Sequence, residues 1–253
     1  MSLCSHKDGI SIRIPPRAAR VLAAVALGAL VSGCASPGGR MAGENDPLEP
    51  LNRAVFRFND AADRNFVKPA AKAYNKHVPA PVRKGIRNFF RNAFEPTVIV
   101  NDFLQGKIKQ GLADGWRFAI NTTVGLLGFI DVASKLGLEP HKEDFGQTLA
   151  KWGVGEGPYL VLPFLGPSNL RDGLGLIPYY RYTNPLSTVD DREAALLLLT
   201  AEGISVRADL LGTEAILEQA ALDRYRFVRE AYRQKRLSLI HDGRPPLDYE
   251  LED

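Results

Sequence analysis

Apolar residues recur at steps of three and four along most of the chain after residue 45. The clearest case is the run Leu48, Leu51, Val55, Phe58, Ala62 and Phe66. This spacing places the apolar side chains on one side of a helix. Asp46 as an N-cap, Pro47 at the first helical position and Glu49 three residues after the cap predict where the helix begins. Pro69 predicts that it ends before that residue, because the residue preceding a proline disfavours helical backbone.

The same periodicity predicts further helices, most of them short and separated by proline or glycine. They cover residues 70–78, 82–93, 97–104, 106–123, 131–136, 145–152, 168–180, 190–211 and 222–239. The dipeptide Glu95-Pro96 is expected to end one helix before Thr97 begins the next. We therefore predict an all-α fold, built from many short amphipathic helices, for a single domain over residues 46–240.

Residues 153–168 do not fit this helical pattern. Their sequence, GVGEGPYLVLPFLGPS, is strongly apolar but carries glycine or proline every few positions. Such residues interrupt a helix, and proline is excluded from the central strands of a sheet. Because the segment is apolar, we expect it to be buried in protein, in lipid or in both.

A basic and then apolar segment opens the chain. Arg13, Arg17 and Arg20 precede an apolar run from Val21 to Val31, and Ser32-Gly33-Cys34 follows it. That order is typical of a secretory signal, and a cysteine directly after two small residues resembles the cleavage site of bacterial lipoproteins. Cleavage before Cys34 leaves this cysteine to carry the acyl chains that anchor the protein to a membrane. The alternatives are an ordinary signal with a chance cysteine and a short transmembrane anchor, but the run is well below the roughly 20 residues that span a bilayer.

These features divide the chain into four parts. Residues 1–33 are expected to be the signal peptide, 34–45 a lipidated linker, 46–240 the helical domain and 241–253 an acidic, disordered tail. Ala35 favours the outer membrane of a two-membraned bacterium, because an aspartate after the lipidated cysteine resembles a signal for retention at the inner membrane.

The charge of the chain does not indicate nucleic-acid binding. The whole chain has a net charge of +3, and residues 1–33 alone carry four basic residues and one acidic residue, so the mature chain is close to neutral. Residues 64–117 hold eleven lysines and arginines against three acids, whereas residues 190–223 hold eight acids against two arginines. The basic part could rest on anionic lipid headgroups, or both parts could be solvated helix faces, and the sequence leaves both open. With Cys4 in the signal and Cys34 lipidated, no disulfide is expected.

No motif of the chain indicates catalysis. The histidines do not pair at a metal-ligand spacing, and Gly153-x-Gly155-x-Gly157 lacks the spacing of a dinucleotide fingerprint. Ser168 and His141, the latter near Glu143 and Asp144, are weak candidates for a lipid-acting hydrolase, since a helix cap and polar loop residues explain them as well. We therefore expect no enzyme, no cofactor and no metal site.

Several motifs, in order along residues 46–235, resemble those of one known family. They are Asp46-Pro47-Leu48-Glu49-Pro50-Leu51-Asn52-Arg53 with Phe56-x-Phe58-Asn59, Asn101-Asp102-Phe103-Leu104-Gln105-Gly106, Asn121-Thr122, Gly128-Phe129-Ile130-Asp131-Val132-Ala133, Phe145-Gly146-Gln147-Thr148-Leu149, Gly153-Val154-Gly155-x-Gly157-Pro158-Tyr159 with Leu162-Pro163-Phe164, and Leu170-Arg171-Asp172. Each motif alone is weak, but the ordered set is specific. By these motifs the chain resembles the VacJ/MlaA family of outer-membrane lipoproteins.

The resemblance implies a ring of helices in the inner leaflet of the outer membrane, around a central amphipathic channel. Through it, phospholipid misplaced in the outer leaflet would pass to a soluble periplasmic carrier, and trimeric porins would be further partners. An amphipathic channel suits this task because burying an unpaired charge in hydrocarbon is costly. Broken helices are tolerated at membrane depth where protein or a water-filled cavity satisfies their backbone.

Our candidate for the channel-forming segment is the stretch of residues 153–168. The candidate residues are Gly153, Gly155, Gly157, Pro158, Tyr159, Val161, Leu162, Pro163 and Phe164. The alternative function is that of a structural lipoprotein that scaffolds porins without conducting lipid. A buried cavity of mixed polarity would favour transport, whereas a solid helical core would favour the scaffold.

Overall fold

The computed structural model describes residues 46–220 and 223–246, with side chains left out for 213–220. Residues 46–253 cluster as one compact unit, separate from residues 1–45. The predicted signal peptide, Cys34 and the linker therefore lie outside the described residues, as does the tail from residue 247.

Helices dominate this unit. They are α2 (Glu49–Ala62), α3 (Lys68–His77), α4 (Ala80–Leu104), α5 (Ile108–Thr123), α6 (Phe145–Lys151), α7 (Leu170–Pro178), α8 (Arg192–Ala220) and α9 (Arg224–Ile240). Single π-helical turns lie at Asp63–Val67 and Tyr179–Thr183, and 3-10 turns at Ala133–Leu136 and Pro185–Thr188. One antiparallel hairpin, β1 (Tyr159–Leu162) with β2 (Gly166–Asn169), interrupts the helices.

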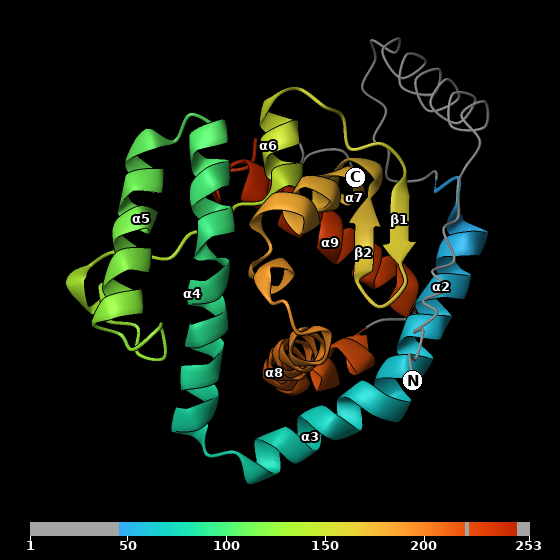
Figure 1. The fold of residues 1–253 in the computed structure, drawn as a ribbon. Coiled ribbons are helices and arrows are strands. Elements are labelled where there is room, and N and C mark those ends of the chain that lie inside the picture. Colours follow the sequence, from blue (N-terminus) through green and yellow to red (C-terminus); the bar gives the residue numbers. More distant parts are fainter. Residues whose placement is uncertain (1–45, 221–222, 247–253) are drawn as a thin grey trace, which may run out of the picture. The chain divides into compact units, whose positions relative to one another are not determined.

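Contacts between elements close a circuit (Figure 1). Helix α3 packs on α8, α8 on α4, α4 on α6, α6 on α7 and α9, α9 on β2, and β1 on α2, which leads back to α3 through the π-helical turn. Helix α5 packs on α4 outside this circuit. The expectation of an all-α fold with a ring-like arrangement of helices is confirmed for the described unit.

The segment that fitted neither a helix nor a central strand forms the hairpin. Tyr159 lies opposite Asn169 and Leu162 opposite Gly166, and Pro163 falls in the turn between the strands. Pro167 can lie within β2 because both strands of a two-stranded sheet are edge strands, where a proline need not donate. Within the turn Phe164 adopts a left-handed conformation with φ of 63°.

Pro96 does not end a helix, contrary to the prediction. Helix α4 runs without a break from Ala80 to Leu104, with Pro96 inside it. A proline removes only one hydrogen bond of the ladder, and buried polar contacts hold α4 on both sides of it. Glu95 lies 3.3 Å from Arg117 of α5, and Asn101 accepts from the Thr148 hydroxyl of α6 at 2.7 Å. Tertiary contacts therefore override the local signal.

The start and the end of α2 also differ from the prediction. The helix begins at Glu49 with Leu48 as N-cap, so Pro50 rather than Pro47 occupies the first turn. Asp46 acts one step earlier, since its carboxylate accepts from the backbone nitrogen of Leu48 at 3.1 Å. At the other end the π-helical turn carries the chain into α3, where Pro69 stands in the first turn and needs no donor.

The apolar stripe of α2 is largely exposed, although its periodicity is that of a core-facing helix. Leu51 and Phe66 are 59% and 75% exposed. The buried face carries Asn52 instead, whose amide donates to the Tyr159 carbonyl oxygen and accepts from the Val161 nitrogen, both at 2.9 Å. Two turns later Asn59 binds the backbone of Leu162 and Phe164 in the same way. Two asparagines thus hold the hairpin on α2.

Exposed large apolar side chains recur beyond α2. They include Ile108, Leu112, Trp116, Val124, Leu126, Leu127, Leu136, Trp152, Phe164, Ile177 and Leu197. Where exposed apolar side chains gather into patches, they mark sites of protein or membrane contact. Within residues 46–220 and 223–246, no helix is both long enough and apolar enough to cross a bilayer.

Candidate functional site

A cavity of about 510 Å³ lies between α4, α6, α7, α8, α9 and the hairpin. Its apolar lining includes Phe94, Val98, Leu162, Leu165, Leu176 and Leu199. Its polar lining includes Asp144, Ser168, Asp172, Glu202, Tyr232 and Arg236. Cavities of roughly 300–1,000 Å³ with a mainly apolar lining and a few polar groups are typical of small-molecule sites. The mixed lining matches a ligand with a charged end and an apolar end.

One polar wall of the cavity, formed by Asp144, Asp172, Tyr232 and Arg236, consists of side chains that are already paired with one another. Arg236 of α9 lies 2.7 Å from Asp172 through Nε, and its Nη2 donates to Asp144 at 3.0 Å. Tyr232, one turn earlier on α9, donates its hydroxyl to Asp172. Burial works to raise the pKa of Asp144, but the hydrogen bonds and charge of Arg236 outweigh it and hold the pKa below its ordinary value. This wall is therefore polar without a free positive charge.

The candidate channel residues on the two strands point to different surroundings. Leu162 lines the cavity, together with Leu165 and Ser168 of the same segment. Tyr159 and Val161 instead form a small core with Tyr225 of α9. The split follows from the strand itself, since side chains alternate between its two faces.

The other candidates lie at the ends of the hairpin, away from the cavity lining. Phe164 is exposed and packs its ring edge-on against Phe58 at 5.2 Å between centroids. Pro163 is exposed beside it. Gly157, with φ of 65°, leaves no room for a side chain, because an added Cβ would lie 2.9 Å from the Cβ of Leu170.

Three candidates remain in the loop that enters β1. Gly153 and Gly155 are exposed, with open space where a Cβ would stand. The carbonyl oxygen of Pro158 accepts from the Leu170 nitrogen at 3.0 Å, which fixes the start of α7 against this loop. The segment as a whole therefore supplies one wall of the cavity through its later residues.

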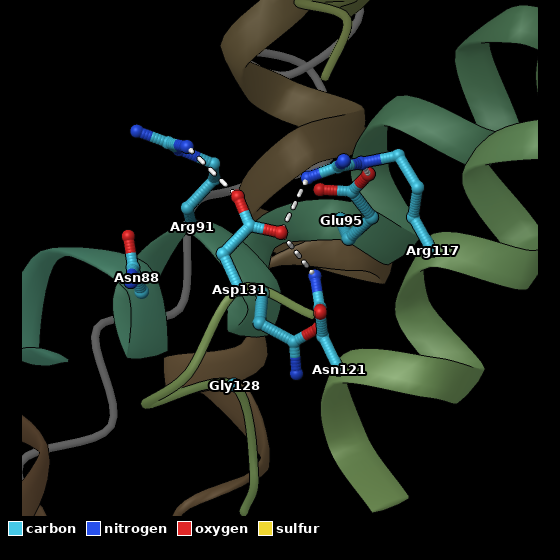
Figure 2. Close-up of a pocket in the computed structure, with 8 residues that line it drawn as sticks. Asn88, Arg91, Glu95, Arg117, Asn121, Gly128 and Asp131 are labelled. Carbon is cyan, nitrogen blue, oxygen red and sulfur yellow. Dashed lines mark hydrogen bonds and ion pairs between the residues drawn. The ribbon is translucent and has the colours of Figure 1, made fainter. Parts of the chain in front are cut away.

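A second, buried polar site joins α4 and α5, and sequence analysis did not predict it (Figure 2). Arg117 is 1% exposed and lies 3.3 Å from Glu95 and 3.7 Å from Asp131. Asn121 donates to the same Asp131 oxygen at 3.2 Å. The space between these side chains is about 10 Å³, room for roughly one water molecule. The small size of this space and the pairing of its charges with one another indicate a structural role, which is to hold α5 against α4.

The same helix pair buries a second group of acids. Asp102 and Asp114 are both fully buried. Gln110 donates to Asp102 at 2.7 Å, and His141 lies 2.9 Å from Asp114. Burial, followed by the neighbouring Asp114, raises the pKa of Asp102 to about 8. The polar residues on the inward side of these two amphipathic helices are the part of the sequence that could have indicated this group. Periodicity alone, however, predicts that such polar residues face solvent.

The weak hydrolase candidates are not brought together. His141 binds Asp114, whereas Glu143 binds Lys107 at 2.7 Å and Asp144 binds Arg236. Ser168 donates its hydroxyl to the carbonyl oxygen of Asn169 at 3.2 Å. Among the described side chains, no group of histidines, cysteines and acids is placed to hold a metal ion.

The buried acids predict that the protein loses stability as the pH rises. Burial raises the pKa of Glu95 to about 7, above its ordinary 4.5, even though Arg117 lies beside it. Glu95 and Asp102 then keep protons in the folded state that they release on unfolding, so their contribution is complete at low pH and is lost as the pH rises through the folded pKa values. We expect the Tm of the full chain in detergent to fall by on the order of 5 °C between pH 6 and pH 8.5.

Glu95→Gln and Asp102→Asn test the origin of that slope. Each variant removes one titrating group and should flatten the dependence of Tm on pH. Asp223→Asn is a matched control, because hydrogen bonds from Arg53 lower the pKa of Asp223 to about 2, well below this range. A slope that survives in the Glu95→Gln, Asp102→Asn double variant would contradict the assignment.

Comparison with known proteins gives consistent matches. The family model described as MlaA lipoprotein matches residues 44–238. The intermembrane phospholipid transport system lipoproteins MlaA of Shigella flexneri and of Escherichia coli (strain K12) are each 42% identical over 229 residues, which is 88% of this chain and 89% of theirs. The Haemophilus influenzae protein of the same name is 34% identical over 230 residues, with 88% and 90% covered.

A solved structure shares the fold. It is described as the structural basis for maintenance of bacterial outer membrane lipid asymmetry, and it matches with a TM-score of 0.69 and 38% identity. The match covers 78% of this chain and the whole of the other.

Proposed function

The chain belongs to the MlaA lipoprotein family, and we propose that it acts in intermembrane phospholipid transport and holds lipid in the cavity between α4, α7 and α8. By this activity it maintains the lipid asymmetry of the outer membrane. The observation that carries the proposal is the 510 Å³ cavity with an apolar lining and a paired polar wall. Such a cavity gives acyl chains an apolar surface and gives the headgroup polar neighbours, so neither end is desolvated without compensation.

The cavity also favours transport over the alternative function of a porin scaffold. A protein that only holds porins in place gains nothing from a hollow centre, because unfilled space costs packing energy. The described unit instead keeps an open space in the middle of its circuit of helices.

The exposed apolar side chains support a position in the inner leaflet of the outer membrane. Leu51 on α2, Phe66 in the π-helical turn after α2, Trp116 on α5 and Leu126 in the loop after α5 all reach the surface. In water such surface is unfavourable, whereas acyl chains cover it without cost. Lipid on Cys34 supplies the tether that brings this surface to the membrane.

Two partners complete the proposed route. A soluble periplasmic carrier accepts the lipid, and a trimeric porin holds the protein at its place in the outer membrane. Both follow from the family membership, and the apolar surface outside the cavity offers the area that a membrane-embedded partner needs.

The test is a transfer assay with the full lipidated chain reconstituted in vesicles. Labelled phospholipid is expected to move to a soluble periplasmic lipid carrier, and cells that lack the protein are expected to accumulate phospholipid in the outer leaflet. If no lipid is transferred and the outer leaflet of deletion cells is normal, the proposal is wrong. Normal asymmetry together with a loss of porin organisation would instead favour the scaffold.

Replacing the anchor tests how the protein is held. Cys34→Ser removes the acyl chains, but the exposed apolar side chains remain and still favour membrane over water. We expect the variant to associate with the wrong membrane, as measured by density-gradient separation of inner and outer membranes. A folded variant found wholly in the soluble periplasmic fraction would show that lipid on Cys34 is the sole anchor.

A further inference from the structure

The cavity contains one acidic side chain that no basic residue neutralises. Glu202 of α8 lines the cavity one turn after Leu199. Arg236 is the only basic side chain among the described lining residues, and Asp144 and Asp172 already occupy it. Within the described part of the chain, no hydrogen bond or ion pair reaches the Glu202 carboxyl group. Glu202 is therefore an acceptor that faces the ligand space.

Two aromatic rings line the same cavity as this carboxyl group. Tyr179 and Tyr180 have ring centroids 4.9 Å apart and planes at 66°. Burial, then Tyr180 and then the charge of Glu202 raise the pKa of the Tyr179 hydroxyl. A carboxylate and aromatic rings that line one cavity can together bind an ammonium group, by charge and by cation–π attraction.

The energetics of Glu202 favour a cationic ligand group. Burial raises the pKa of Glu202, because nothing beside it compensates the charge of the ionised form. A cation placed there would offset that cost. An additional negative charge on the ligand would be repelled, because Lys107 already pairs with Glu143, and the lining holds Asp144, Asp172 and Glu202 against Arg236.

We propose that Glu202, with Tyr179 and Tyr180, binds the ammonium group of a zwitterionic phospholipid headgroup, so that the cavity takes phosphatidylethanolamine in preference to phosphatidylglycerol. These two lipids share the phosphate and the acyl chains and differ in the ammonium group, which is the group that Glu202 can recognise. The inference rests on the proposed function and names the headgroup of its lipid.

The test measures which lipid the full chain retains. The detergent-purified lipoprotein is incubated with vesicles of equal parts phosphatidylethanolamine and phosphatidylglycerol with identical acyl chains, then separated from them, and its bound lipid is quantified by mass spectrometry. We expect phosphatidylethanolamine to exceed phosphatidylglycerol by roughly fivefold to tenfold, the size of a charge-assisted contact after solvation costs.

Variants assign the preference to Glu202. Glu202→Gln keeps the shape and removes the charge, so the ratio should fall toward that of the vesicles, while Glu202→Asp should retain most of it. Glu193→Gln makes the same change at an exposed position of the same helix and should leave the ratio unchanged. An unchanged thermal melting curve of Glu202→Gln shows that the variant is folded.

The outcomes separate this inference from the proposed function. Retention of both lipids in the vesicle ratio by the native chain would overturn the headgroup preference and leave the transport function in place. A preference that survives in Glu202→Gln would overturn the role of Glu202. Failure to retain either lipid, combined with failure in the transfer assay, would overturn both proposals.

Discussion

Arg117→Met is expected to lower the free energy of unfolding by about 3–5 kcal/mol, the cost of removing one partner from a buried ion pair. Arg117 is almost fully buried between α4 and α5. It donates to Glu95 at 3.3 Å and to the Ser134 hydroxyl at 3.1 Å, and its charge faces Asp131. Methionine fills a similar volume, so the loss comes from the carboxylates that remain without a cation and not from an empty space.

The measurement is urea unfolding of the full chain in detergent at pH 8, where both Glu95 and Asp131 are ionised in the folded state. Arg91→Met is the matched control, since the Arg91 side chain is 43% exposed and approaches Asp131 only to 3.7 Å. An exposed pair of this kind contributes less than about 1 kcal/mol. Equal losses in the two variants would show that the buried network is not what holds α5 on α4.

A second change in the same network sharpens the result. Adding Glu95→Gln to Arg117→Met removes one of the carboxylates that the loss of Arg117 leaves without a cation. The free energy of unfolding of the double variant should therefore fall by less than the sum of the two single effects. Simple additivity would mean that Glu95 and Arg117 act independently in spite of their contact.

Leu162→Asp and Val161→Asp are expected to have opposite consequences, although the residues are neighbours on β1. Leu162 lines the cavity, so a carboxylate there meets the acyl chains and should reduce transfer of labelled lipid at least about tenfold, which corresponds to ~1.4 kcal/mol. The Tm should change little, because the new charge can take up water from the cavity.

Val161→Asp instead should destabilise the fold. Val161 is buried in the small core with Tyr159 and Tyr225, where no basic side chain belongs to the cluster of described residues. Burying an unpaired charge there should cost about 3 kcal/mol or more and release the hairpin from α2 and α9. Limited proteolysis at the hairpin and the Tm report this loss, and Leu162→Met serves as the neutral control for transport.

This pair decides whether the cavity is the lipid path. If Leu162→Asp transfers lipid normally while remaining folded, the path runs elsewhere. If both variants lose stability to the same extent, β1 is packing on both faces and the cavity is not accessible to ligand.

The family and the helical class were both accessible from the sequence. Ordered motifs such as Asn101-Asp102-Phe103-Leu104-Gln105-Gly106 and Phe145-Gly146-Gln147-Thr148-Leu149 depend only on residue identity and order. Apolar periodicity likewise depends on neighbours within one or two turns, so most helices were predicted close to their observed positions. Cys34 remains a prediction of the sequence, outside the described residues.

Helix ends and facing were decided by contacts that no local pattern contains. Pro96 predicts the end of a helix. The contacts of Glu95 with Arg117 and of Asn101 with Thr148 nevertheless keep α4 continuous through Pro96. The apolar stripe of α2 predicts a side that faces the core. Asn52 faces inward instead, because its side-chain amide forms hydrogen bonds with the backbone of β1, more than 100 residues away. Periodicity reports that a helix has two different faces, but not which of them meets water, protein or lipid.

The candidate site shows the same division between local and tertiary information. Composition singled out residues 153–168 as an unusual apolar segment, and Leu162, Leu165 and Ser168 do line the cavity. Which strand residue points into the cavity depends on the register of β1 with β2, and the opposite wall comes from residues such as Glu202 and Arg236, far along the chain. The sequence by itself determined the family and the kinds of elements, because those follow from residue order and short-range spacing. Only the tertiary structure decided which charges are paired, which face is buried and where the cavity lies, because each of these depends on side chains that folding brings together from distant positions.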